Sequence, residues 1–236
     1  MGEEFEDRDL SESVFWGVKL TDSTFRDVDL SGSTMFHVSA RDVSIDGVVE
    51  RLVVNGVDVT DHVNANDRWF PLRTMLEPQT VEECRAAWSR VLGEWNALVE
   101  RTRQMSEASL HQSVNGEWSF RDTLRHLLFV RDKWFAWPLL GRRQFTPLGL
   151  PNTGSRDGDW PGLDLSLDPA VDEVLAGRGI QNEEFSEWLD SVDFAALPAE
   201  SEVLENGAMP TVMCLHAVLE EEFEHLRYAL RDLDSL

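Results

Sequence analysis

The sequence has few cysteines, little positive charge and no long hydrophobic run. Only two cysteines, Cys84 and Cys214, occur in 236 residues, and each lies among apolar neighbours. Two distant, buried free thiols are expected, which fits a cytoplasmic protein rather than a disulfide-stabilised one. The N-terminal stretch MGEEFEDRD is acidic and lacks the apolar core of a signal peptide. Because no run of about 18 or more apolar residues occurs, no membrane-spanning helix is expected.

Positive charge is scarce relative to negative charge. The chain has 21 Lys and Arg against 44 Asp and Glu, a formal net charge of -23. Phosphate backbones and anionic membrane surfaces require the opposite sign, so neither nucleic acid nor membrane is expected as a partner. Walker, GxGxxG, GxSxG and CxxC motifs are also missing. The apolar content of 42% nevertheless predicts a folded core.

The first sixty residues repeat with a period of five. A five-residue period fits neither an α-helix nor an ordinary β-strand. Units such as VDLSG and VKLTD give the segment its resemblance to the pentapeptide-repeat family. The large or apolar residues at every fifth position are Phe5, Leu10, Phe15, Leu20, Phe25, Leu30, Met35, Ala40 and Ile45.

The pentapeptide-repeat resemblance implies a short, right-handed, quadrilateral β-solenoid over residues 1–60, with four repeats in each coil. Fewer than three coils bury little core, because a solenoid is stabilised by the stacking of neighbouring repeats. We therefore expect a scaffold that packs on the domain after it. Asn55–Gly56 predicts a turn near its end, and residues 61–79, with Pro71 and Pro78, are expected to be a linker.

Residues 80–236 contain four segments with helical periodicity. Thr80 and Glu83 form a capping box before the first helix, and Ser119 marks the start of the second, which Pro138 is expected to end. Four helices joined in this way predict a four-helix bundle, and the whole chain is expected to be a multi-domain α+β protein. The helices are expected at 81–105, 120–137, 168–192 and 209–236, with loops at 141–167 and 197–208.

The last predicted helix carries a carboxylate and an imidazole on one face. Glu221 and His225 are one helical turn apart and share that face with small or apolar residues. Burying these two polar groups is costly unless they form an ion pair or bind a metal ion. His216 lies about 180° around the helix and cannot join the same site. A solvated ion pair on the surface is the alternative interpretation.

The second predicted helix offers a third candidate ligand, His126, which lies among apolar residues. A hydrogen-bonded core histidine is the alternative. If the two helices face each other, His126, Glu221 and His225 form a set of two histidines and one carboxylate with open positions. Such a set suits Fe, and also Zn, Ni or Mn, and open positions are what catalysis requires.

Two stretches resemble the DinB-like superfamily, and more narrowly its branch related to mycothiol-dependent enzymes. They are W-S-x-x-x-x-L-x-H-L at 118–127 and EEFEHLRYALRDLD at 221–234. The resemblance covers residues 80–236. It implies a DinB-like four-helix bundle in which one histidine of the second helix and two of the fourth hold a divalent metal ion.

Carried over to this sequence, the metal ligands fall on His126, Glu221 and His225. Glu221 stands where the commonest family pattern has histidine. A glutamate carboxylate can also bind a metal ion, so this difference preserves a residue that can act as a ligand. Glu222 is the alternate ligand if the register differs by one residue.

The resemblance also implies an activity. Family members with a known reaction use the metal to activate a low-molecular-weight thiol, and then transfer or isomerise a small electrophilic molecule. A small-molecule substrate, a place in specialised metabolism and pairing as a homodimer are implied as well. Trp118, Trp134, Trp137 and Arg131 are candidates to line the pocket, although core packing is favoured for the tryptophans. The loop 141–167 is expected to close over the substrate.

Two other functions stay open on the sequence alone. Some acidic pentapeptide-repeat proteins imitate DNA and occupy topoisomerases, but three coils would extend only about 15 Å at the spacing of neighbouring strands. A DinB-like bundle could instead sequester a small toxic compound without turnover.

Overall fold

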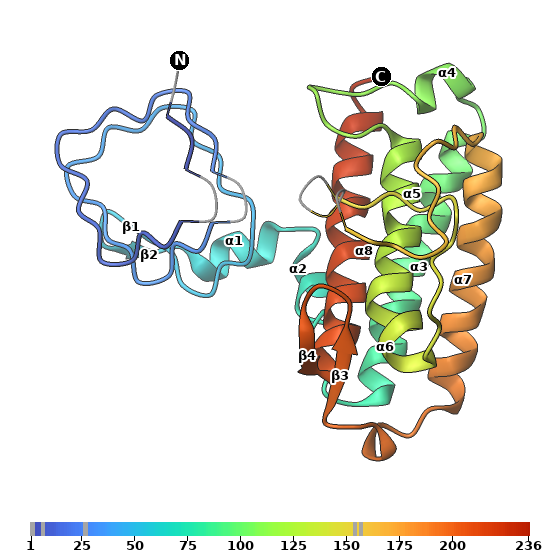
Figure 1. Ribbon diagram of the computed structural model, residues 1–236. Coiled ribbons are helices and arrows are strands. Elements are labelled where there is room, and N and C mark those ends of the chain that lie inside the picture. Colours follow the sequence, from blue (N-terminus) through green and yellow to red (C-terminus); the bar gives the residue numbers. More distant parts are fainter. Residues whose placement is uncertain (1–2, 6–7, 26–27, 153–154, 156–157) are drawn as a thin grey trace. The chain divides into compact units, whose positions relative to one another are not determined.

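The computed structural model divides the chain into two units, residues 1–47 and residues 48–236. It describes every residue except 1–2, 6–7, 26–27, 153–154 and 156–157. The larger unit is mainly helical, whereas the smaller one is a coil without helices in its described part (Figure 1). No helix in the described part of the chain is long and apolar enough to cross a membrane.

The smaller unit follows the five-residue period in its backbone. At every second repeat the leucine carbonyl group, that of Leu10, Leu20 or Leu30, accepts a hydrogen bond from the N–H three residues later. The large apolar side chains are exposed, Phe15 by 62%, and no β-strand occurs among the described residues of this unit. The closed β-solenoid therefore stays a prediction. The five-residue period also shows in the backbone dihedral angles, because φ is positive at Glu12, Gly17, Asp22, Gly32, His37 and Asp42. Position 27, which would continue this series, lies outside the described residues.

Residues 48–79 belong to the helical unit, although 61–79 were expected to be a linker. The predicted Asn55–Gly56 turn is present, and it joins two short paired strands that the sequence analysis did not predict. Leu72 joins the hydrophobic core, and Trp69 meets Phe223 of the last helix edge-on at 5.8 Å. The helices in this segment are short and contain too few apolar residues to show a helical period, so the sequence analysis did not predict them. The elements are β1 (Val53–Val54), β2 (Val57–Asp58), α1 (Thr60–Asn66) and α2 (Phe70–Arg73).

Four long helical segments form the bundle, as the sequence predicts (Figure 1). The expected capping box is present, because Thr80 Oγ1 accepts from the N–H of Glu83 and the Glu83 carboxylate accepts from the N–H of Thr80. Gly177 does not break its helix, since it lies against Leu128 of the neighbouring helix. The four long helices are α3 (Val81–Thr102), α5 (Phe120–Arg131), α7 (Val171–Ser191) and α8 (Thr211–Leu233), and the short helix α4 (Glu107–Leu110) follows α3.

The second long helix continues past Pro138, so the prediction that this proline ends it is wrong. α5 passes through a π-helical turn, Asp132–Ala136, into α6 (Trp137–Leu140). Proline clashes with the carbonyl group four residues earlier in a regular α-helix, and the wider turn relieves that clash. The helix instead ends at Gly141, whose φ is 65°.

Residues 197–208, expected to be a loop, contain part of a β-hairpin. β3 (Glu200–Val203) pairs antiparallel with β4 (Gly207–Pro210) after a short 3-10 turn, Phe194–Ala196. The dipeptide Asn-Gly at 206–207 is a hairpin signal that could have predicted it. The hairpin contacts α6 and α8, so it lies beside the helix that carries two of the candidate ligands.

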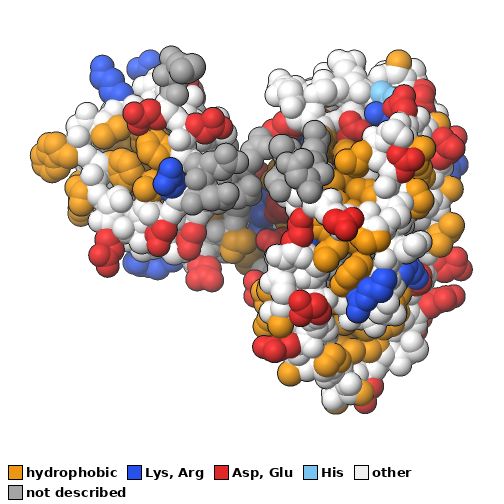
Figure 2. All heavy atoms as spheres, in the orientation of Figure 1, with side chains coloured by type: hydrophobic (Ala, Val, Ile, Leu, Met, Phe, Trp, Pro, Cys, Tyr) orange, Lys and Arg blue, Asp and Glu red, His pale blue; other side chains and the backbone are white. Residues whose placement is uncertain are grey.

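The long loop 141–167 is present as expected, and its described residues run along α5. The N–H of Leu150 donates to the carbonyl of Arg125, and Arg125 Nε donates to the carbonyl of Leu148 at 2.9 Å. Figure 2 shows acidic side chains spread over the face of the helical unit rather than gathered in one patch.

Candidate metal centre

α8 places Glu221 and His225 on the side of the bundle that meets α5. His225 Nδ1 donates a hydrogen bond of 2.9 Å to the backbone carbonyl of Glu221 and lies 3.3 Å from its Oε2. The i,i+4 spacing of the helix makes both contacts local. The His225 side chain is 15% exposed and that of Glu221 34%, so the imidazole is mostly buried and the carboxylate is partly exposed.

α5 brings His126 to the same place. Its Nδ1 donates to the carbonyl of Leu150 at 3.0 Å, and its Nε2 lies 3.4 Å from Oε2 of Glu221. One ligand atom from each of His126, Glu221 and His225 lies within 4.8 Å of the other two. The structure therefore brings together all three residues that the sequence singled out.

The donor set fits a divalent metal ion. Because the Leu150 carbonyl can only accept, His126 carries its proton on Nδ1, as metal-binding histidines commonly do. Its Nε2 lone pair then faces a carboxylate oxygen, and two acceptors that face each other need a proton or a cation between them. Two ligands bound at about 2.1 Å in a tetrahedral site are roughly 3.4 Å apart. The Nε2–Oε2 separation of His126 and Glu221 is also 3.4 Å.

The electrostatics favour the protonation states that bind metals. Burial, followed by the charge of His126, lowers the pKa of His225 to about 4, although Glu221 opposes the shift. Burial raises the pKa of Glu221, but a protonated His126 imidazole, which would donate to this carboxylate, and the charges of His225 and Lys133 outweigh burial and lower the pKa. A neutral imidazole and an ionised carboxylate are the forms that coordinate a metal ion.

Trp118 covers the two imidazole rings. Its ring centroid lies 4.6 Å from that of His126 and 6.1 Å from that of His225. Of the four residues proposed to line a pocket, Trp118 is the one with these ring contacts. Trp134 packs on the main core, and Trp137 packs on a smaller cluster around Phe129.

Glu222, the alternate ligand, faces away from the three candidate ligands and into the bundle core. It is 1% exposed, and its carboxylate accepts hydrogen bonds of 2.7 Å from Arg131 and from both terminal nitrogens of Arg178. Arg131 also lies over the rings of Trp88 and Phe185. The carboxylate is therefore committed to this buried ion cluster, and Arg131 is a core residue rather than a pocket residue.

The two cysteines are free and buried, as the sequence predicts. Burial raises the pKa of Cys84 to about 12 and that of Cys214 to about 11. Neither thiol can supply a thiolate near neutral pH. His216 also stays outside the candidate metal centre, since its Nε2 hydrogen-bonds the carbonyl of Pro78 at 2.9 Å.

Sequence reasoning overlooked Lys133, Glu205 and Ser155. Lys133 Nζ lies 3.7 Å from Oε2 of Glu205 in the β3–β4 turn, and Ser155 Oγ donates to the same oxygen at 3.0 Å. Lys133 follows His126 by seven residues, which places both on one face of a helix. That spacing could have identified the lysine, whereas nothing local links it to Glu205 or Ser155.

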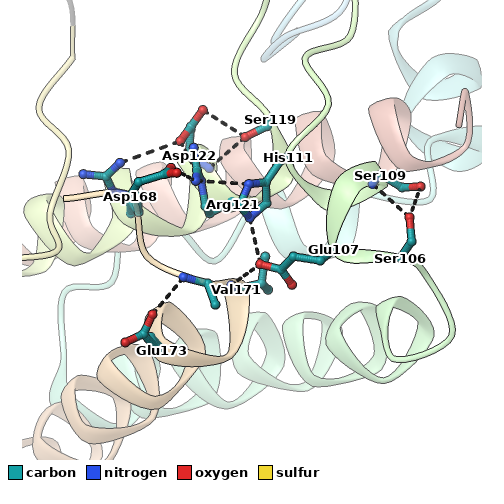
Figure 3. Close-up of polar contacts among 12 residues, drawn as sticks. Ser106, Glu107, Ser109, His111, Ser119, Arg121, Asp122, Asp168, Val171 and Glu173 are labelled. Carbon is teal, nitrogen blue, oxygen red and sulfur yellow. Dashed lines mark hydrogen bonds and ion pairs between the residues drawn. The ribbon is translucent and has the colours of Figure 1, made fainter. Parts of the chain in front are cut away.

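A polar network fixes the start of the helix that carries His126 (Figure 3). Arg121 of α5 forms an ion pair with Asp168, which precedes α7, and Arg121 Nη1 lies 3.1 Å from His111 Nδ1. Glu107 of α4 hydrogen-bonds His111 and accepts from the first N–H of α7. These contacts hold α4, α5 and α7 together at one end of the bundle.

A family model described as the DinB superfamily matches residues 92–229, a range that includes all three candidate ligands. No curated protein and no solved structure matches the chain.

Proposed function

The chain belongs to the DinB superfamily, and from that premise we propose that its helical unit is a divalent-metal-dependent enzyme. In this proposal the enzyme transfers or isomerises a small electrophilic molecule with the help of a low-molecular-weight thiol. The observation that carries it is the convergence of His126, Glu221 and His225 within 4.8 Å. The narrower assignment, to the branch related to mycothiol-dependent enzymes, is supported by the stretches at 118–127 and 221–234.

A divalent ion in this centre, whether Zn, Ni, Fe or Mn, would hold an external thiol as the thiolate and so supply a nucleophile at neutral pH. The thiol has to come from outside the chain, because Cys84 and Cys214 are buried with raised pKa values. Two neutral imidazoles and Glu221 leave one positive charge on such a centre, which attracts an anion.

The surrounding residues position the ligands and cover part of the candidate metal centre. The carbonyl of Leu150 orients the His126 ring, and it ties the loop 141–167 to the candidate metal centre. Trp118 covers both imidazole rings with an apolar surface. A covered site strengthens the electrostatic interactions inside it.

We also propose that residues 1–60 are a pentapeptide-repeat scaffold. The support is the recurrence of left-handed backbone at five-residue intervals from Glu12 to Asp22 and again from Gly32 to Asp42.

The metal proposal is tested with protein purified without a chelator. Elemental analysis should find one divalent ion per chain in the wild type and none in His126→Ala. His62→Ala is the matched control, because His62 is exposed on α1 and should keep the ion. Added metal at about 100 times its Kd stabilises by about 2.7 kcal/mol, which raises the melting temperature of a domain of this size by roughly 5–10 °C.

The proposal is contradicted if the wild type contains no metal and Zn2+, Ni2+, Mn2+ and Fe2+ all leave its melting temperature unchanged. Loss of metal from His62→Ala as well would show that the assay does not report on the centre.

A further inference from the structure

A lysine lies beside the candidate metal centre in a chain that has very few. Lys133 is one of two lysines in the sequence. It follows His126 by two helical turns, and its charge helps to lower the pKa of Glu221. Its side chain is 11% exposed, so most of its length is buried. Buried lysines are rare and need a partner.

The ammonium group of Lys133 has one anionic partner at ion-pair distance among the contacts described, but no hydrogen bond to it. Its Nζ lies 3.7 Å from Oε2 of Glu205, which exceeds hydrogen-bond length, and 5.4 Å from the rings of Trp134 and Trp160. Burial lowers the pKa of Lys133, although Glu205 and Glu221 both oppose this shift. Glu205 lies within ion-pair distance without forming a hydrogen bond to the ammonium group, so an added oxyanion can supply that hydrogen bond.

Glu205 is held against Lys133 in an unfavourable conformation. Its φ is 70°, in the left-handed region, which is strained for a residue other than glycine. Its carboxylate accepts from Ser155, and a Cβ added to Gly158 would come within 2.3 Å of its other oxygen. Strained residues of this kind cluster at functional sites. The Glu205 side chain is 37% exposed at the tip of a hairpin, so it can leave its position.

The backbone of Lys133 is fixed by the π-helical turn. Asp132, the first residue of that turn, accepts a hydrogen bond from the N–H of Thr146 at 2.6 Å and another from Gln181 at 3.2 Å. π-helical turns occur frequently at functional sites. The turn and these anchors hold Lys133 in position before any ligand arrives, which reduces the cost of binding.

We infer that Lys133 binds a carboxylate group of the substrate, and that Glu205 occupies this subsite until the substrate replaces it. The inference rests on the proposed function and narrows its substrate class to small carboxylic acids. In a protein with a net charge of -23, an anion needs a local positive field, which Lys133 supplies. The group that the structure places against Lys133 is itself a carboxylate, that of Glu205, and a carboxylate of the substrate would replace it with the same charge and shape.

The test compares two thiols that differ only in charge, 3-mercaptopropionate and 3-mercaptopropionamide. Both are titrated into the wild type, Lys133→Met, Glu205→Gln and the control Lys19→Met, which removes the other, exposed lysine. Each protein is measured metal-free and loaded with Co2+. Tryptophan fluorescence reports binding in both forms, and the cobalt absorption spectrum reports occupancy of the candidate metal centre.

The wild type and Lys19→Met should bind the acid roughly tenfold more tightly than the amide, as expected for one charge-assisted contact. Lys133→Met should bind both thiols equally, with an unchanged Kd for the amide. Glu205→Gln should tighten binding of the acid several-fold, because the competing carboxylate is gone.

The inference is overturned if the wild type does not prefer the acid, or if Lys133→Met retains the preference. Failure of the proposed function gives a different result, namely a protein that takes up no Co2+. The preference for the acid, read by fluorescence in the metal-free protein, then still decides the role of Lys133.

Discussion

Replacing Glu222 by glutamine should destabilise the protein far more than the same change at its neighbour Glu221. The Glu222 carboxylate is 1% exposed and accepts three hydrogen bonds of 2.7 Å from Arg131 and Arg178. Burial raises its pKa, but the two guanidinium groups outweigh this and lower it, so the group is ionised in the folded protein. Glutamine keeps a similar shape but leaves two buried cations without their anion.

Breaking a buried ion pair by removing one partner costs about 3–5 kcal/mol. For a protein of this size that lowers the melting temperature by roughly 6–20 °C. Glu221 is 34% exposed and has no arginine partner among the ion pairs described for it. Its replacement should change the stability of the metal-free protein by less than about 1 kcal/mol, while metal binding is lost.

The assay is urea unfolding of the chelator-treated proteins, followed by helical circular dichroism, with Zn2+ binding measured separately under native conditions. We expect Glu222→Gln to be unstable but still able to bind Zn2+, and Glu221→Gln to be stable but unable to bind it. The reasoning is refuted if Glu222→Gln lies within about 1 kcal/mol of the wild type. It is equally refuted if the two variants exchange these properties.

Three further predictions concern the two cysteines, Trp118 and the helical unit on its own. Cys84 and Cys214 should react with a thiol reagent at pH 8 only after unfolding, since burial raises their pKa values to about 12 and about 11; rapid labelling of the native protein would contradict this. Trp118→Phe should remove most of the tryptophan fluorescence quenching caused by Co2+, because the Trp118 ring contacts that of His126. The Kd for Co2+ should stay within about twofold of the wild type. Unchanged quenching would place the metal elsewhere. A chain of residues 48–236 should unfold cooperatively with the metal affinity of the full protein, because the core and the candidate metal centre lie within it; failure to fold would show that the repeat is required.

The sequence predicted the helices well wherever a cap and a period agreed. Thr80 and Ser119 lie before α3 and α5 as expected, because each cap depends on contacts three residues away. Pro138 misled the prediction, since the π-helical turn that accommodates it depends on the packing of Asp132 against Thr146 and Gln181. The hairpin and the short helices before residue 80 were overlooked for a similar reason. Short elements are stabilised mainly by what they pack on.

Local periodicity was sufficient to place Glu221 and His225 on one face of a helix, because residues four apart in an α-helix are neighbours whatever surrounds them. It could not choose between Glu221 and Glu222, since a rotation of about 100° separates them and either could face α5. The tertiary structure made that choice when Arg131 and Arg178, from two other helices, enclosed Glu222 in the core. The meeting of separate helices and the placing of Lys133 against Glu205 were likewise decided by packing, which acts between segments far apart in the chain.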